Sequence, residues 1–163
     1  MKLKLAALVC LVSSLSAFAE GKITLHVELS PAGSFEASSG KIEGQLIKKN
    51  DLLVAEKISV NIQSLQTGID LRDEHFWKHL NSRKFSNAII TKFEGREGKA
   101  TAMLEVSGVK KPIKISYKEK GDEIIGNFKV SNQDYKLPVV EYMGIGVEDE
   151  VVCEVNMPFR RLL

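Results

Sequence analysis

The stretch KISVNIQSLQTGIDLRDEHFWKHL, residues 57–80, decides the fold because its character changes from alternating to helical within one short segment. Ile58, Val60 and Ile62 alternate with the polar residues between them. This two-residue period is typical of a strand that has one buried face and one solvated face. The pair Thr67-Gly68 is a turn signal that ends the strand.

The second half of the stretch predicts one short helix. Asp70 stands where a carboxylate accepts the first unpaired N–H groups of a helix. Asp73 and Glu74 follow in the expected first turn, where negative charge interacts favourably with the helix dipole. We therefore expect a helix that begins at Asp70 and is inserted into an otherwise β-rich chain.

Alternation of apolar and polar residues continues through the rest of the chain, between turns rich in Gly, Pro, Asn and Asp. Expected strands cover residues 23–29, 41–49, 52–63, 88–94, 100–106, 112–118, 123–130 and 147–157. About eight strands with short connections predict an all-β fold, either an antiparallel sandwich or an up-and-down barrel. No internal repeat or linker divides the sequence, so we expect one domain.

The N-terminus has the pattern of an export signal. Residues 1–19 contain two lysines, an apolar run and the small-x-small site Ala17-Phe18-Ala19. The apolar run is shorter than the roughly 20 residues that a membrane-spanning helix needs, so a membrane anchor is the weaker interpretation. We expect residues 1–19 to be removed as a signal peptide, which leaves residues 20–163 as a periplasmic or secreted domain.

The charge balance argues against nucleic-acid binding. The chain has 23 Lys and Arg against 21 Asp and Glu, and removing the two lysines of residues 1–19 leaves 23 − 2 = 21 positive charges against 21 negative ones. A neutral chain with scattered lysines lacks the concentrated basic face that releases counterions from phosphate. We therefore expect no nucleic-acid partner.

Cysteine use leaves one thiol in the exported domain. Cys10 lies in the expected signal peptide, so Cys153 has no partner for an intramolecular disulfide. Alternation places Cys153 on one strand face with Val151, Val155 and Met157. A buried thiol is therefore favoured over a reactive one.

Catalytic and metal-binding motifs are weak. His75 and His79 have a four-residue spacing that can chelate zinc or copper, but no glutamate follows His75 and no third ligand is evident. The sequence has no G-x-S-x-G elbow and no C-x-x-C motif. Arg72 and the neighbouring acids are favoured as internal partners of one another, with a ligand headgroup as the alternative. We expect no catalytic residues, no metal and no enzymatic activity, and a lipid-modifying enzyme is the weakest alternative.

Several motifs in a fixed order resemble the YceI-like, polyisoprenoid-binding proteins of bacteria. They are GSFEASSGKIEG (33–44), ISVNIQSLQTGIDLRDEHFWKHL (58–80), FEG (93–95), SGVKKPIKI (107–115) and YMGIGVEDEVVCEV (142–155). The resemblance implies an exported, lipocalin-like antiparallel barrel with a helical insertion that holds an isoprenoid or similar lipid. It implies no enzymatic activity. The chain departs from the family pattern at residues 80–87, where an aromatic run ending in proline is common.

The apolar faces of the expected strands, together with the helix, supply candidate ligand-binding residues. On the helix, Phe76, Trp77 and Leu80 fall within one face and are expected to cap the barrel or touch the lipid. The strands contribute Leu25, Val27, Phe35, Leu46, Ile58, Val60, Ile62, Phe93, Leu104, Val106, Ile113, Ile115 and Phe128. The same residues would fill a solid core equally well, so this pattern does not distinguish an open barrel from a packed one.

The expected function is therefore carriage or storage of a polyisoprenoid or fatty-chain lipid, with no cofactor. The alternative is a periplasmic protein-interaction module whose barrel is filled by side chains. Transient membrane contact and a homodimer are further associations that the sequence leaves open.

Overall fold

The computed structural model describes residues 20–162, so the expected signal peptide of residues 1–19 lies outside the described residues. The strands are β1 (Lys22–Ser30), β2 (Ser34–Ser39), β3 (Ile42–Gly44), β4 (Leu46–Lys49), β5 (Leu52–Asn61), β6 (Asn87–Arg96), β7 (Lys99–Val106), β8 (Val109–Lys120), β9 (Glu123–Ser131), β10 (Glu141–Tyr142) and β11 (Ile145–Leu162). The helical elements are a 3-10 turn, η1 (Ile62–Ser64), and one α-helix, α1 (Asp70–His79). Within this part of the chain, no helix has the length and apolar character needed to cross a bilayer.

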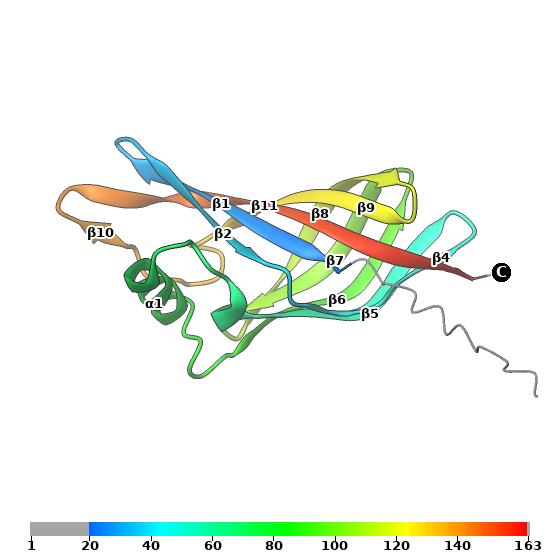
Figure 1. The fold of residues 1–163 in the computed structure, drawn as a ribbon, viewed down its shortest axis with the longest axis horizontal. Helices are drawn as coiled ribbons and strands as arrows, with labels where there is room; N and C mark the ends of the chain where they lie inside the picture. The colour runs from blue at the N-terminus through cyan, green and yellow to red at the C-terminus, as the bar shows by residue number, and fades with distance from the viewer. Residues whose placement is uncertain (1–19, 163) are drawn as a thin grey trace, which may run out of the picture.

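The strands close into a barrel, which confirms the predicted all-β class with a short helical insertion. Strands β4 to β9 follow one another around the ring, and β11 closes it by pairing with β9 on one side and with β4 on the other. The closed ring thus has seven strands, with further strands attached to it. Figure 1 shows β11 running along the length of the molecule, with β1 beside it.

Two features of the sheet differ from a simple up-and-down antiparallel barrel. The pairing of β11 with β4 is parallel, in the register Phe159 to Leu46. Strand β2, which the sequence analysis did not predict, forms an antiparallel hairpin with β1 outside the closed ring. The length of β11 accommodates both features, since its first part pairs with β1 and its last residues pair with β4.

A glycine bulge joins the two short strands that pair with β5. Gly44 pairs with Ile58, whereas Ile47 pairs with Val54, so the register shifts by one residue between β3 and β4. The φ angle of Gly44 is +124°, and a Cβ atom there would lie 2.4 Å from the carbonyl oxygen of Lys57. Only glycine fits this position, because the bulge brings two backbones together.

The helix begins where the sequence predicted, but Asp70 does not cap it. Ile69 occupies the N-cap position, and no side chain accepts a hydrogen bond there. Asp73 instead accepts hydrogen bonds from the backbone N–H of Thr67 at 2.7 Å and from its hydroxyl at 2.5 Å. The buried carboxylate therefore fixes the loop before the helix, and the expectation of an Asp70 cap was wrong because the loop folds back toward Asp73.

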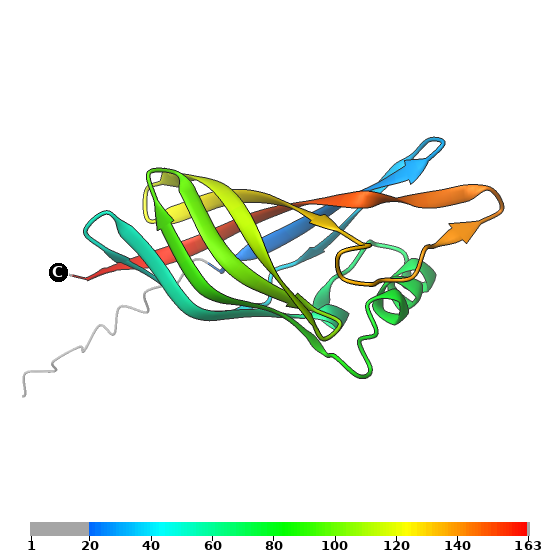
Figure 2. The same cartoon turned by 180° about the vertical axis from the view of Figure 1, so that it is seen from behind.

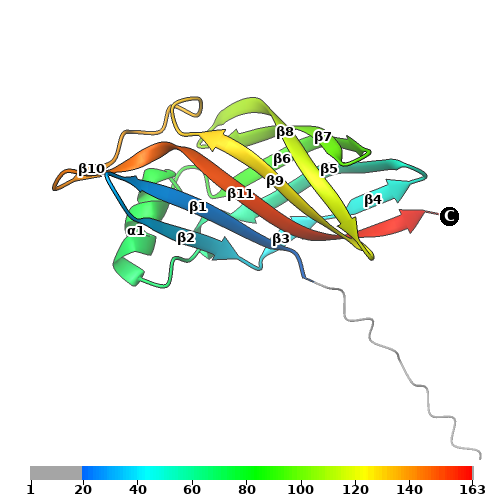
Figure 3. The same cartoon turned by 90° about the horizontal axis from the view of Figure 1, so that it is seen from above.

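Helix α1 lies at one end of the barrel, beside the β1–β2 hairpin (Figures 1 and 3). The Phe76 ring meets the ring of Phe35 in β2 edge to face, with centroids 6.4 Å apart. The indole N–H of Trp77 donates a hydrogen bond of 2.7 Å to the carbonyl oxygen of Leu65. These contacts hold α1 across the end of the barrel rather than along its outer wall.

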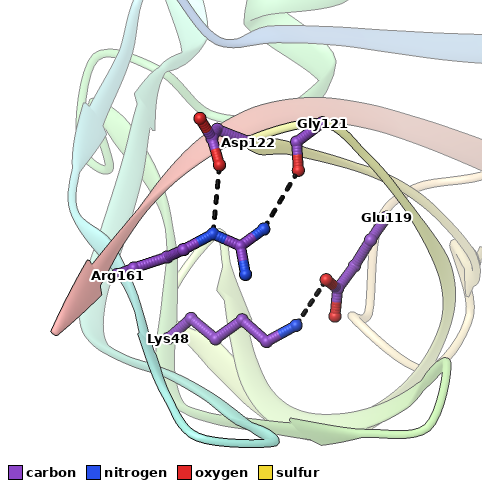
Figure 4. A network of polar contacts seen from close by, with 5 residues as sticks. All are labelled: Lys48, Glu119, Gly121, Asp122 and Arg161. Carbon is purple, nitrogen blue, oxygen red and sulfur yellow. Dashed lines mark hydrogen bonds and ion pairs between the residues drawn. The ribbon is translucent and has the colours of Figure 1, made fainter. Parts of the chain in front are cut away.

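Charged side chains connect strands at the opposite end (Figure 4). The Lys48 ammonium in β4 lies 2.5 Å from a carboxylate oxygen of Glu119 in β8. The Arg161 Nε in β11 donates to Asp122 in the β8–β9 turn at 3.1 Å. The Phe159 ring lies beneath both cations, 5.6 Å from Lys48 Nζ and 5.1 Å from Arg161 Cζ. The two ends of the barrel therefore differ in chemistry, with α1 at one and ion pairs at the other.

Candidate ligand cavity

A cavity of about 290 Å³ lies inside the barrel, at the end covered by α1. Its wall is built from β1, β2, β5, β6, β7, β9 and β11, together with α1 and the loop between β9 and β10. Two of its lining residues, His75 of α1 and Val140 of that loop, are exposed to solvent. The cavity therefore reaches the surface between the helix and the loop.

A smaller cavity of about 50 Å³ continues the interior toward the other end of the barrel. The two cavities share the wall residues Ile23, Ile58, Val60, Ile90 and Phe128. Every side chain that lines the smaller cavity is apolar. The apolar interior of the barrel therefore extends over both cavities, which suits an elongated apolar group.

The structure brings most of the predicted ligand-binding residues into this interior. Eleven of them line the larger cavity: Leu25, Val27, Phe35, Ile58, Val60, Ile62, Phe76, Leu80, Leu104, Val106 and Phe128. Leu46, Phe93 and Ile115 line the smaller cavity instead. Strand alternation places these side chains inside the barrel, while the cavities show that the barrel is not filled by them.

Trp77 and Ile113 line neither cavity. The Trp77 indole is turned toward Leu65, to which it donates its N–H. Ile113 belongs to the buried core, with an exposed fraction of 8%. The sequence pattern placed these two residues with the others because helical or strand periodicity does not show which inward side chains border an open space.

Other residues of the larger cavity were not predicted to bind ligand. The apolar ones are Ile23, Leu65, Ala88, Ile90, Val130, Leu137, Val140, Val147, Val151 and Cys153. Several extend the same strand alternation and could have been included on that signal, such as Val151 and Cys153, which the sequence analysis placed on one buried face. Leu137 and Val140 lie in an irregular loop, whose contribution no periodicity indicates.

Four polar side chains complete the wall of the larger cavity: Arg72, His75, His79 and Asn132. The Arg72 Nη2 donates a 3.0 Å hydrogen bond to the carbonyl oxygen of Thr67, and its guanidinium carbon lies 4.8 Å from the centre of the Phe35 ring. The Arg72 Nε and the His79 Nδ1 are buried and have no hydrogen-bond partner among the described residues. Polar atoms of this kind are uncommon in the wall of an apolar cavity.

Burial shifts the pKa values of two residues in the cavity wall, His79 and Cys153. Burial lowers the pKa of His79 below the ordinary histidine value, and the side chain of Asn132 opposes part of this effect. Burial raises the pKa of Cys153 to about 12, so this thiol is protonated and unreactive at neutral pH. The prediction of a buried cysteine is therefore confirmed. No group of three His, Cys, Asp or Glu residues within residues 20–162 is placed to hold a metal ion.

Comparison with solved structures shows the same fold in bacterial proteins of low sequence identity. BcnA from Burkholderia cenocepacia superposes with a TM-score of 0.68 and 14% identity, over 84% of this chain and 94% of BcnA. A domain from Saccharophagus degradans, described as a polyisoprenoid-binding domain implicated in plant cell wall breakdown, gives a TM-score of 0.61 and 13% identity, over 87% of this chain and 96% of that domain. No curated protein matches the sequence.

The family model for the YceI-like domain matches residues 15–159, which is nearly the whole chain. The match includes the strand–turn–helix segment of residues 57–80 and the long strand β11 up to Phe159. It confirms the resemblance that the sequence motifs indicated. The chain therefore belongs to the family of YceI-like domain proteins.

Proposed function

We propose that this protein is an exported carrier or store of lipid, which encloses the apolar tail of a polyisoprenoid or a similar long-chain amphiphile inside its barrel. The observation that carries this proposal is the apolar cavity that reaches the surface between α1 and the loop before β10. The protein acts by enclosure and without covalent chemistry. Export rests on the signal pattern of residues 1–19.

The chemistry of the cavity wall supports a hydrocarbon ligand. Transfer of apolar surface from water into a dry cavity is favourable by about 25 cal/mol per Å². A tail that buries roughly 500 Å² would gain about 12 kcal/mol before the costs of association and chain ordering. The open space inside the barrel weighs against the alternative of an interaction module with a filled interior.

One of the fold neighbours supports an isoprenoid as the ligand class. The domain from Saccharophagus degradans is described as binding polyisoprenoids. A prenyl chain and a fatty chain present the same kind of surface to the strand residues of the barrel. We therefore propose a polyisoprenoid as the first ligand class, with other long single-chain amphiphiles as further ligands.

Exposed apolar residues near the cavity mouth support transient contact with a membrane. The hairpin of β10 and β11 exposes Tyr142 by 75%, Met143 by 84% and Ile145 by 48%. Figures 1 and 2 show this hairpin at the same end of the molecule as α1. We propose that the apolar rim, defined as Val139, Val140, Tyr142, Met143 and Ile145, rests on a bilayer while lipid enters or leaves.

Two features of the apolar rim and the charge of its neighbour Glu141 bear on contact with a membrane. Val140 belongs to the rim and also lines the cavity, so apolar surface is continuous from the exposed hairpin to the interior. Met143 has a φ angle of +52° at the hairpin tip, where Asn or Gly is usual. Glu141 adds a negative charge, which disfavours strongly anionic membranes.

A paired substitution on β5 tests whether the interior holds the tail. Val60 lines both cavities with 7% of its surface exposed, whereas Ser59 points to the other face of the same strand. Val60→Asp places a charge in the dry interior and is expected to lower retention of a long-chain lipid at least tenfold. Ser59→Asp adds the same charge to the same strand and is expected to leave retention unchanged.

The measurement is the amount of a labelled polyprenol retained per folded protein, with circular dichroism as the check on β content. If Val60→Asp unfolds the protein, Val60→Ala is the second variant, and its smaller side chain is expected to change retention while Ser59→Ala does not. Equal retention by the variants of both positions would contradict the proposal that the tail lies in the barrel.

A further inference from the structure

Arg72 is the only residue with a permanent charge among the described residues that line the larger cavity. It comes from the first turns of α1, and the remaining wall is apolar apart from two histidines and one asparagine. No Asp or Glu of residues 20–162 belongs to that wall. The cavity thus presents one fixed positive charge to whatever fills it.

The guanidinium is held in place without a carboxylate. Its Nη2 donates to the carbonyl oxygen of Thr67 at 3.0 Å, and its carbon lies 4.8 Å from the centre of the Phe35 ring. The Phe35 ring is itself fixed by its edge-to-face contact with Phe76. Within residues 20–162, Arg72 takes part in no ion pair, and its Nε is buried without a hydrogen-bond acceptor.

The acids nearest in sequence do not supply the missing acceptor. Asp73 is buried, but its carboxylate accepts two hydrogen bonds from Thr67 and does not line the cavity. Asp70 and Glu74 are exposed on the outer side of α1. An unpaired buried donor of a charged group is unfavourable, and a ligand oxygen that accepts from it removes that cost.

We propose that Arg72 binds the oxyanion headgroup of the lipid, a carboxylate or a phosphate monoester, while the tail extends into the barrel. This inference rests on the proposed lipid-binding function and adds a headgroup class to it. Arginine suits the role because its planar donors match carboxylate and phosphate oxygens, and charge-assisted hydrogen bonds are the strong ones. A neutral alcohol with the same tail can accept a hydrogen bond from the guanidinium but carries no opposite charge, so its interaction with Arg72 is weaker.

The test compares lipids that share a tail and differ only in headgroup. Dissociation constants are measured for palmitate against hexadecanol, and for geranylgeranyl phosphate against geranylgeraniol. The wild-type protein is expected to prefer the anionic member of at least one pair about tenfold. The pair with the larger preference identifies the headgroup as carboxylate or phosphate.

Arg72→Met is expected to abolish the preference, because the anionic ligand loses an interaction with an opposite charge whereas the alcohol loses at most one hydrogen bond. Arg72→Gln, which keeps a donor for Thr67, is the second variant if Arg72→Met does not fold. Lys78→Met is the matched control, because it removes the same charge from an exposed position of the same helix outside the cavity wall. It is expected to retain the preference.

Three results would overturn the inference. Equal affinities within both pairs in the wild type would show no recognition of the charge. A preference that persists in Arg72→Met and Arg72→Gln would place the recognition elsewhere, and tighter binding of inorganic phosphate or acetate than of the lipids would indicate a simple ion site. If the alcohols still bind in any of these three cases, the proposed lipid-binding function stands and only the role of Arg72 is contradicted. If none of the four lipids binds, the proposed function and the role of Arg72 are both contradicted.

Discussion

His79 illustrates how one residue connects the cavity with stability. Burial lowers its pKa in the folded protein, and its Nδ1 has no partner among the described residues. In the unfolded chain the pKa returns to about 6.5. Above that pH both states carry a neutral imidazole, so His79 does not alter the pH dependence of unfolding there.

As the pH falls below about 6.5, the unfolded state binds the proton first, so the free energy of unfolding decreases. We predict that His79→Gln loses less stability than the wild type when the pH is lowered from about 7.5 to about 5.5. Denaturant unfolding at the two pH values measures this difference. The His26–Glu36 pair, at 2.9 Å, is present in both proteins and cancels in the comparison. An identical loss in both proteins would show that His79 is not held neutral by the fold.

At the residue scale, the sequence predicted the buried alternation of β5 but not the partners of the charged residues. Ile58 and Val60 are buried as expected, because the strand period alone determines which face they occupy, and Ile62 is buried as well although it belongs to η1 rather than to the strand. Asp70 was expected to cap α1, yet Asp73 makes the contacts to Thr67. Acids at neighbouring positions have the same propensity for a helix start, and the loop conformation that selects one of them depends on tertiary packing.

Among the elements, the β10–β11 hairpin is the one that we propose to meet the membrane during ligand exchange. We predict that the double variant Tyr142→Ser, Met143→Ser slows lipid transfer to phosphatidylcholine vesicles, because each lost apolar side chain removes about 1.5 kcal/mol or more of membrane contact. The two losses together amount to about 3 kcal/mol, so a decrease of roughly a hundredfold in the transfer rate is expected. The affinity for lipid in solution should stay as in the wild type.

Leu162→Ser is the matched control for this prediction. Leu162 is also an exposed apolar residue of β11, with 53% of its surface accessible, but it lies at the opposite end of the molecule from α1 (Figure 1). Its variant is expected to transfer lipid at the wild-type rate. Equal effects of the control and the double variant would mean that the apolar rim is not the surface that meets the membrane.

The strands also show which elements and pairings a sequence pattern can predict and which it cannot. Most strands were predicted because their alternation is long enough to recognise, and α1 because charge and glycine mark its start. Strand β2, SFEASS, was missed because serines occupy half of it and leave too few apolar residues for a recognisable alternation. The parallel pairing of β4 with β11 joins residues more than a hundred positions apart, and no local pattern indicates such a contact.

For the whole molecule, the barrel could be predicted from the sequence but its empty interior could not. Fourteen of the sixteen predicted ligand-binding residues lie in the wall of one cavity or the other. The same inward pattern would result if the side chains filled the barrel. Whether space is left depends on how the total volume of the inward side chains compares with the volume that the barrel encloses. Leu137 and Val140 add a part of the wall that comes from an irregular loop.

The most direct test of the central claim is native mass spectrometry of the purified protein before and after organic extraction. We predict a mass increment of one long-chain lipid per barrel, which is lost on extraction and restored by adding the extracted lipid back to the protein. The same spectrum reports whether the protein is a monomer or a homodimer. A protein that carries no lipid when purified and takes up neither polyprenols nor fatty-chain lipids would contradict the claim that the barrel encloses a hydrocarbon tail.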